Sequence, residues 1–231
     1  MLQTKSVSPQ LLSVLADLMN LNELSAFRLV GGTALALQLG HYFSNDINLL
    51  TDNDFDRNKV IAVISKIHTL QEISFVDLGI TCFIKEVKIN IFYSSVPFVG
   101  TIILHSGIRM SPPEDIAAFK LNAITDCKEQ KDFYDLYFIL EIIYFSDMIE
   151  MYQKKYPSYN VKAVFTGLSQ IEEANNSVIP DLNVPLTWIE VKEKLIKECT
   201  DYLREIKSKK NELENSRLKD LRELVKQNIS F

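Results

Sequence analysis

A paired glycine and a nearby carboxylate are the residues whose types and spacing suggest chemistry. Gly31-Gly32-Thr33 precedes a short apolar segment, and Asp46-Ile47-Asn48 follows that segment after a polar turn. The segment ends at Gly40, and glycine is common just after the end of a helix. We therefore expect a strand, a glycine turn, a helix, a second turn and a second strand, with Asp46 at the start of that second strand.

The glycine turn has the composition of a phosphate site. Gly31 and Gly32 lack a β-carbon, so their backbone can approach a ligand closely and adopt positive φ. We expect Thr33 at the N-cap of the following helix, where free N–H groups and the helix dipole favour a phosphate.

Asp46 and Asn48 have the spacing of a paired ligand set. Residues i and i+2 of a strand face the same side, so these two side chains should point together. Two carboxylates there would hold a divalent metal against bound phosphates. In this chain the second member of the pair is an amide.

The stretch 31–48, GGTALALQLGHYFSNDIN, resembles the AbiEii/AbiGii-type toxin family of the nucleotidyltransferase superfamily, whose pattern is close to GGTALxLxxGHRxSxDxDLF. A second match is EDIAAFKLNAI (114–124), followed by KDFYDLYFIL (131–140). The resemblance runs from about residue 27 to about 195. The positions that match in the first stretch are Gly31, Gly32, Thr33, Ala34, Leu35, Leu37, Gly40, His41, Ser44, Asp46 and Leu49.

The resemblance implies a mixed-sheet nucleotidyltransferase (polymerase-β-like) domain followed by a helical bundle domain. It implies that phosphates contact Gly31, Gly32, Thr33 and Ser44. It also implies that Lys120, Asp132 and Asp135 line the cleft, with the lysine on the nucleotide phosphate. An interhelical ion pair is the equally weighted alternative for those three residues. For His41, a helix-capping role and a site role both stay open.

The chain departs from the family pattern at three positions. The family arginine after Gly-His is Tyr42, the second carboxylate of D-x-D is Asn48, and the acidic position of a later strand is Asn90. An amide oxygen can bind Mg²⁺ but brings no charge. We therefore predict a catalytic set of Asp46, Asn48, Asn90 and Lys120 with Asp46 and Asn48 as metal ligands, and weak or absent binding of Mg²⁺ or Mn²⁺. The nearby Asp52, Asp54 and Asp56 are less favoured substitutes.

The implied activity is transfer of a nucleotide from an NTP to an RNA or protein acceptor, in a toxin-like protein with a possible antitoxin partner. The alternative is a catalytically inactive relative that binds a nucleotide, RNA or partner protein. Asn48 and Asn90 favour the alternative, whereas the intact Lys120, Asp132 and Asp135 segments favour the enzyme.

Composition narrows the partners and the compartment. The 231 residues carry a net charge of −5, so there is no general attraction to nucleic acid, and we expect no readout of DNA sequence. Three widely separated cysteines suggest a reducing compartment. There is no signal-peptide pattern and no apolar run near about 18 residues. We expect a cytoplasmic protein without a membrane partner.

The remaining elements follow from hydrophobic spacing. Helices are predicted over 9–20, 56–68, 114–125, 130–143, 146–156, 160–173 and 187–227, strands over 27–30 and 46–50, and several strands over 72–110. Ser111 and Glu114 predict a capping box, which places the domain boundary between 1–110 and 111–231. An apolar stripe in the last helix should pack on the bundle; its members are Ile196, Cys199, Leu203, Ile206, Leu213, Leu218, Leu221 and Val225.

Overall fold

The computed structural model describes the chain from residue 1 to residue 228, and residues 229–231 lie outside this description. The side chains of residues 215 and 218–228 also lie outside it, so nothing below concerns the predicted stripe members Leu218, Leu221 and Val225.

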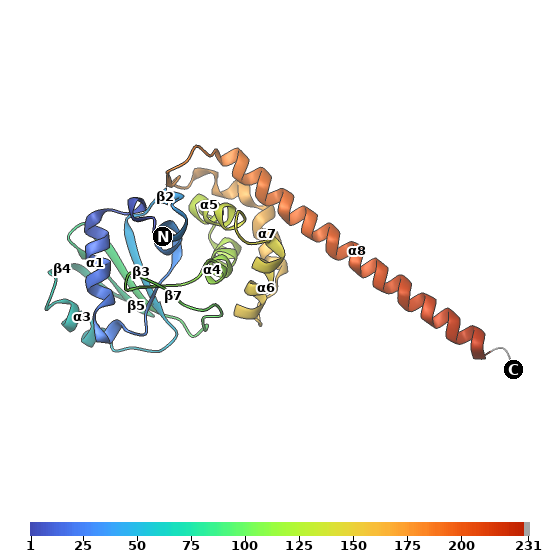
Figure 1. The fold of residues 1–231 in the computed structure, drawn as a ribbon, viewed down its shortest axis with the longest axis horizontal. Coiled ribbons are helices and arrows are strands. Elements are labelled where there is room, and N and C mark those ends of the chain that lie inside the picture. Colours follow the sequence, from blue (N-terminus) through green and yellow to red (C-terminus); the bar gives the residue numbers. More distant parts are fainter. Residues whose placement is uncertain (229–231) are drawn as a thin grey trace.

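The amino-terminal half combines a sheet with three helices (Figure 1). The helices are α1 (Pro9–Met19), α2 (Gly31–Leu39) and α3 (Arg57–Ile64). Side-chain caps start two of them, since Ser8 accepts from the Leu11 N–H and Asp56 accepts from the Lys59 N–H. The strands are β1 (Arg28–Leu29), β2 (Tyr42–Phe43), β3 (Asp46–Thr51), β4 (Leu70–Val76), β5 (Gly79–Ile84), β6 (Val87–Tyr93), β7 (Ile103–His105) and β8 (Ile108–Met110).

Seven strands form one mixed sheet in the order β4-β5-β6-β3-β1-β8-β7. β3 runs parallel to β6 and β1 runs parallel to β8, while the other neighbours are antiparallel. The parallel register places Asn48 opposite Asn90. The register therefore joins two of the predicted site residues across neighbouring strands.

Helices make up the carboxyl-terminal half. They are α4 (Pro113–Asp126), α5 (Gln130–Ile139), α6 (Phe145–Lys155), α7 (Lys162–Ser169) and α8 (Trp188–Asn228). A short strand, β9 (Asp181–Leu182), precedes α8 and pairs with β2 in a separate two-stranded ribbon. The ribbon ties residues far apart in sequence to one edge of the molecule.

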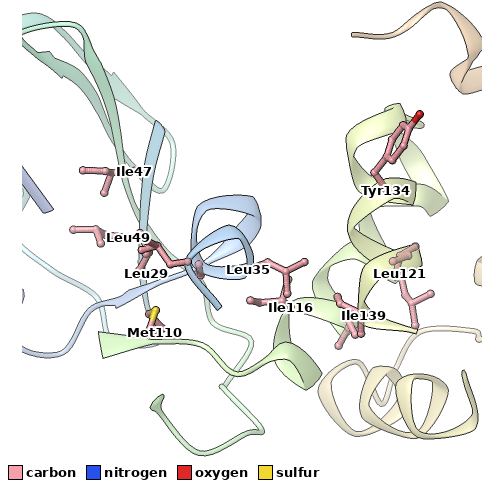
Figure 2. Close-up of a cluster of buried hydrophobic side chains, with 14 of the residues drawn as sticks. Leu29, Leu35, Ile47, Leu49, Met110, Ile116, Leu121, Tyr134 and Ile139 are labelled. Atoms are coloured by element: carbon pink, nitrogen blue, oxygen red, sulfur yellow. The ribbon is translucent and has the colours of Figure 1, made fainter. Parts of the chain in front are cut away.

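One apolar core runs from the sheet into the helices (Figure 2). Leu29 and Leu49 contribute from the sheet, and Leu35 of α2 lies between them and Ile116 of α4. All four side chains are fully buried. α2, which begins at the glycine turn, is thus held between the sheet and the helical half.

The predicted fold class, a mixed-sheet nucleotidyltransferase-like part followed by a helical part, is confirmed. The division at residue 110 stays a prediction. The capping box at Ser111 is wrong: α4 begins at Pro113 with Pro112 as N-cap and no side-chain cap. Pro112, in an extended conformation, and Pro113 at N1 start the helix instead.

The last helix differs from its predicted packing. It is a single helix that projects from the body (Figure 1). Val191, Leu195 and Cys199 are buried against the body, whereas the stripe members Ile196, Leu203, Ile206 and Leu213 are exposed. The buried face is therefore rotated from the predicted stripe, and Cys199 alone of its described members is covered.

No helix in the described part of the chain is both long and apolar enough to cross a lipid bilayer.

Candidate nucleotide-binding site

The carboxylate of Asp46 lies at the start of β3 and is held in place by hydroxyl groups of α2 and the preceding turn. The Thr33 hydroxyl donates to the Asp46 backbone oxygen at 2.6 Å and lies 3.0 Å from Asp46 Oδ1. Ser44 Oγ lies 2.7 Å from Thr33 Oγ1, and it must donate there because the Thr33 proton is already used. Both hydroxyls are buried. In this geometry they orient Asp46.

Thr33 is not the N-cap predicted above. Helix α2 begins at Gly31, its N-cap is Val30, and Thr33 is the third helical residue. The positive φ of Gly31 lets the helix start directly after β1. The hydroxyl of Thr33 consequently points back toward β3 instead of capping its own helix.

The two amides that replace family carboxylates form a hydrogen-bonded chain with Asp46. Asn48 Nδ2 donates to Asp46 Oδ2 at 3.0 Å, and Asn90 Nδ2 donates to Asn48 Oδ1 at 2.8 Å. The Thr81 hydroxyl of β5 donates to Asn90 Oδ1 at 3.1 Å. The structure thus brings Asp46, Asn48 and Asn90 together, as predicted, and adds Thr81.

A second charged cluster links α4 and α5. Lys120 Nζ lies 2.6 Å from Asp132 Oδ1 and 2.5 Å from Asp135 Oδ2. Burial alone would lower the pKa of Lys120, but the carboxylates of Asp135 and Asp132 outweigh it and raise the pKa above its usual range. The interhelical ion pair, one of the two alternatives for these residues, is therefore present.

Asp135 is also bound by His41, which joins the cluster to the end of α2. His41 Nε2 lies 3.0 Å from Asp135 Oδ1, and both side chains are fully buried. Burial would raise the pKa of Asp135, but the charge of Lys120 and the hydrogen bond from His41 lower it. His41 therefore positions Asp135. This role is neither helix capping nor direct contact with a ligand, the two alternatives given above.

Tyr42, which stands in place of the family arginine, lies between the two clusters. Its hydroxyl oxygen lies so close to Gly32 that a β-carbon on Gly32 would overlap it. Burial raises the pKa of Tyr42 well above its usual range, and the carboxylates of Asp135 and Asp46 raise it further. The space left by the missing β-carbon of Gly32 is therefore occupied by the Tyr42 hydroxyl in this structure.

A cavity of about 680 Å³ opens beside Asp46. One wall is the segment from Tyr42 to Asp46, and the other is the segment from Asn176 to Asp181 together with Glu129 and Lys131. Lys131 Nζ lies 2.9 Å from Glu129 Oε2. The β2–β9 ribbon joins the two walls. The cavity has room for a ligand of nucleotide size.

The donor set does not fit the two divalent cations of a two-metal site. Asp46 contributes the carboxylate at this end of β3. The side-chain oxygens of the two amides already accept hydrogen bonds, that of Asn48 from Asn90 and that of Asn90 from Thr81. Among the side chains that the structure describes, no three His, Cys, Asp or Glu residues group as a metal site. Asp56, a possible substitute ligand, caps α3. Asp46 therefore offers one carboxylate to a single cation.

Sequence reasoning missed three participants. Thr81 has no motif and is found only through the β5–β6 register, which places it opposite Asn90. The contact between His41 and Asp135 joins positions far apart in the chain, although both match the family pattern. The hydroxyl of Tyr42 fills space beside Gly32, and no spacing rule predicts this contact.

Comparisons with known proteins identify a family for the chain. The model of the family described as "Nucleotidyl transferase AbiEii toxin, Type IV TA system" matches residues 13–198. An uncharacterised protein of Aquifex aeolicus (strain VF5) is 27% identical over 183 residues, which cover 77% of this chain and 88% of that protein.

One of the solved structures compared with this chain shares the fold. An H. pylori protein assigned as a nucleotidyltransferase superposes with a TM-score of 0.53 at 16% identity, covering 89% of this chain and 95% of its own. MenT4, a nucleotidyltransferase toxin of Mycobacterium tuberculosis, gives a TM-score of 0.48 at 13% identity, with 81% and 82% covered. Because the family model spans most of the sequence, this chain belongs to the AbiEii nucleotidyltransferase toxin family.

Proposed function

We propose that this chain is a toxin-like nucleotidyltransferase with a one-carboxylate site, which transfers a nucleotide from an NTP to an RNA or protein acceptor. The position of Asp46 carries the proposal. Its carboxylate contacts Thr33 and Asn48, and Asp46 is one of the residues that line the cavity of about 680 Å³. A reacting group held at the wall of a cavity of this size is the usual arrangement of an active site.

The proposed roles follow from the contacts. Asp46 would ligate the cation that accompanies the NTP, Mg²⁺ or Mn²⁺, with Asn48 and Asn90 as neutral neighbours. The N–H groups at the start of α2, from Gly31 and Gly32, would donate to the phosphates. Thr33 and Ser44 act through Asp46. Asp132 and Asp135 would hold Lys120 near the nucleotide.

In the proposed reaction, an acceptor hydroxyl oxygen bonds to the α-phosphorus, its proton passes to solvent water, the bond from that phosphorus to the bridging oxygen breaks, and pyrophosphate leaves. The cation, when bound, neutralises charge on the phosphates. The chain itself contributes positioning and electrostatic stabilisation. Because one carboxylate replaces a set of three, we expect slow turnover.

A second candidate is a relative that binds a nucleotide, RNA or a partner protein without turnover. The amide chain favours it, because Asn48 and Asn90 satisfy one another without any cation. Three carboxylates at the same positions would repel one another unless a cation lay between them.

Transfer of α-labelled NTP to total RNA and protein, with Mg²⁺ or Mn²⁺, tests the proposal. We expect the native chain to label an acceptor, Asp46→Ala to lose the label, and Asp77→Ala, a matched change in an exposed carboxylate, to keep it. Labelling only by Asn48→Asp/Asn90→Asp would instead support the binding protein. If no variant labels, NTP binding measured with and without Mg²⁺ decides between the binding protein and an empty cleft.

We also propose a cognate antitoxin and a cytoplasmic location. The family description as a toxin–antitoxin system supports the antitoxin. The three widely spaced cysteines, which are free, support a reducing compartment. Co-expression with neighbouring genes and rescue of growth would test the antitoxin.

A further inference from the structure

We infer that Asn48 competes with a cation for Asp46 in the native chain, and that Asn90 and Thr81 are positioning residues, because their hydrogen bonds hold the Asn48 amide with its nitrogen toward Asp46. The inference rests on the proposed cation at Asp46 and concerns how the neighbouring strands β5 and β6 control that cation. Neither Thr81 nor its contact with Asn90 has a role in the family pattern considered above.

The polarity of the chain follows from one fixed acceptor. An ionised carboxylate can only accept hydrogen bonds, so Asn48 must turn its Nδ2 group toward Asp46. Its oxygen then faces Asn90, which must offer its own Nδ2. The Asn90 oxygen in turn accepts from the Thr81 hydroxyl. Each link therefore sets the next, and all donors point toward Asp46.

This polarity works against cation binding. The Asn48 group nearest Asp46 is an N–H donor, which occupies a lone pair of Asp46 Oδ2 and places a partial positive charge beside any cation. The Asn48 oxygen, predicted above as a metal ligand, is 2.8 Å from Asn90 Nδ2. In the native chain Asn48 thus competes with a cation for Asp46.

The chain can reverse, because every member except Asp46 can both donate and accept. The single change Asn90→Asp would release the Asn48 oxygen, because a carboxylate at position 90 has no hydrogen to donate to it. When a cation occupies Asp46, the Asn48 amide can then turn its oxygen toward that cation and donate an Nδ2 hydrogen to the carboxylate at position 90, which also keeps the Thr81 hydroxyl hydrogen. Asp46 and the Asn48 oxygen would together hold the cation.

The test is the affinity for Mn²⁺ alone, measured on the purified full chain from the electron paramagnetic resonance signal of free Mn²⁺. Four proteins form a cycle: native, Asn48→Leu, Asn90→Asp and the double variant. In the native background we expect Asn48→Leu to leave the affinity unchanged or to raise it. In the Asn90→Asp background the same change should lower it about 10- to 100-fold, the usual effect of losing a ligand or its orienting partner.

The sign of the effect of Asn48→Leu on Mn²⁺ affinity distinguishes a change in the orientation of the Asn48 amide from the added negative charge at position 90. If the charge at position 90 alone strengthens binding, Asn48→Leu will have the same effect in both backgrounds, and the inference is overturned. Failure of Asn90→Asp to bind Mn²⁺ more tightly than native also overturns it. Thr81→Val in the Asn90→Asp background should weaken Mn²⁺ binding, and Thr81→Ser, which keeps the hydroxyl, should not.

Two further measurements keep folding and the proposed function separate from this outcome. Far-ultraviolet circular dichroism confirms that each variant is folded before Mn²⁺ is added. NTP binding, followed by calorimetry on the same samples, tests the proposed function independently. A chain that binds no NTP but shows the reversed effect of Asn48→Leu would refute the transferase and retain the inference.

Discussion

At the scale of single residues, the contacts of Lys120 bear on whether this lysine stabilises the fold or contacts a nucleotide. Its ammonium group is enclosed by Asp132 and Asp135, and all three side chains are buried. A buried charge whose partner is removed is far more costly than an exposed one. The contacts of Lys120 therefore make it a stabilising residue, whatever else it binds.

Replacing Lys120 by methionine should cost about 3–5 kcal/mol in the free energy of unfolding, because two buried carboxylates lose their counter-ion. Urea unfolding measures this value. The matched control is Lys154→Met, which breaks the exposed pair with Glu150 away from the cavity and should cost about 1 kcal/mol or less. Equal, small losses in the two variants, with NTP binding lost only in Lys120→Met, would assign the lysine to the nucleotide instead.

The lowered pKa of Asp135 predicts how the free energy of unfolding depends on pH. Its pKa is lowered in the folded chain, so its contribution is present above the unfolded value of about 3.9 and is lost as pH falls through the folded pKa. The pKa of Lys120 is raised, so its contribution is complete below about 10.4 and is lost at higher pH. We expect the free energy of unfolding to fall below about pH 4, less so in Asp135→Asn. An unchanged acid limb in that variant would contradict the assignment.

At the scale of elements, the start of α2 is built around the tyrosine hydroxyl of β2. A β-carbon on Gly32 would meet the Tyr42 oxygen first, while the ring carbon behind that oxygen would be 3.1 Å away. The glycine turn therefore has a packing role in addition to any phosphate contact.

Gly32→Ala should destabilise the chain by about 1–3 kcal/mol through overpacking. Tyr42→Phe removes the obstructing oxygen, so the double variant should lose less than the sum of the two single losses. Contacting residues usually couple by about 0.5–3 kcal/mol in such a cycle. Urea unfolding of the four proteins measures the coupling, and strict additivity would show that the hydroxyl is not the obstacle.

Much of this architecture was predictable from local patterns. The order of strand, glycine turn, helix and strand around Asp46 follows from glycine and hydrophobic spacing, and the structure has it. The start of α4 was missed because two prolines displaced the expected serine cap. The contact of Asn90 with Thr81 was not predictable, because strand register depends on pairing that no single strand encodes.

At the scale of the whole molecule, α8 has two parts with different environments. Up to Cys199 it is packed on the body, and Tyr202 still contacts Phe145 with ring centroids 5.5 Å apart. Beyond it, Leu203, Ile206 and Leu213 are exposed. The sequence pattern indicated an apolar stripe but could not indicate which face the body covers.

Deleting residues 210–231 should leave the midpoint of thermal unfolding within about 2 °C of native, because the side chains described there, those of 210–214 and 216–217, are exposed, and exposed positions contribute little to stability. A deletion that starts at residue 195 should lower it clearly, since Leu195 and Cys199 are buried against the body. Differential scanning calorimetry compares the two. A large loss from the shorter deletion would mean that the distal part of α8 is covered in solution.

The β2–β9 ribbon has a consequence for when the cavity can exist. Asn183 donates its backbone N–H to the His41 oxygen and its side-chain Nδ2 to the Gly40 oxygen, both at 2.9 Å, so the two cavity walls are tied together across most of the chain. The conformational entropy of these walls is therefore lost when the chain folds. Binding of a ligand does not have to order the walls again. A nascent chain that has not yet been synthesised through residue 183 lacks one wall of the cavity. The cavity beside Asp46 can therefore form only after residue 183 has been added to the chain.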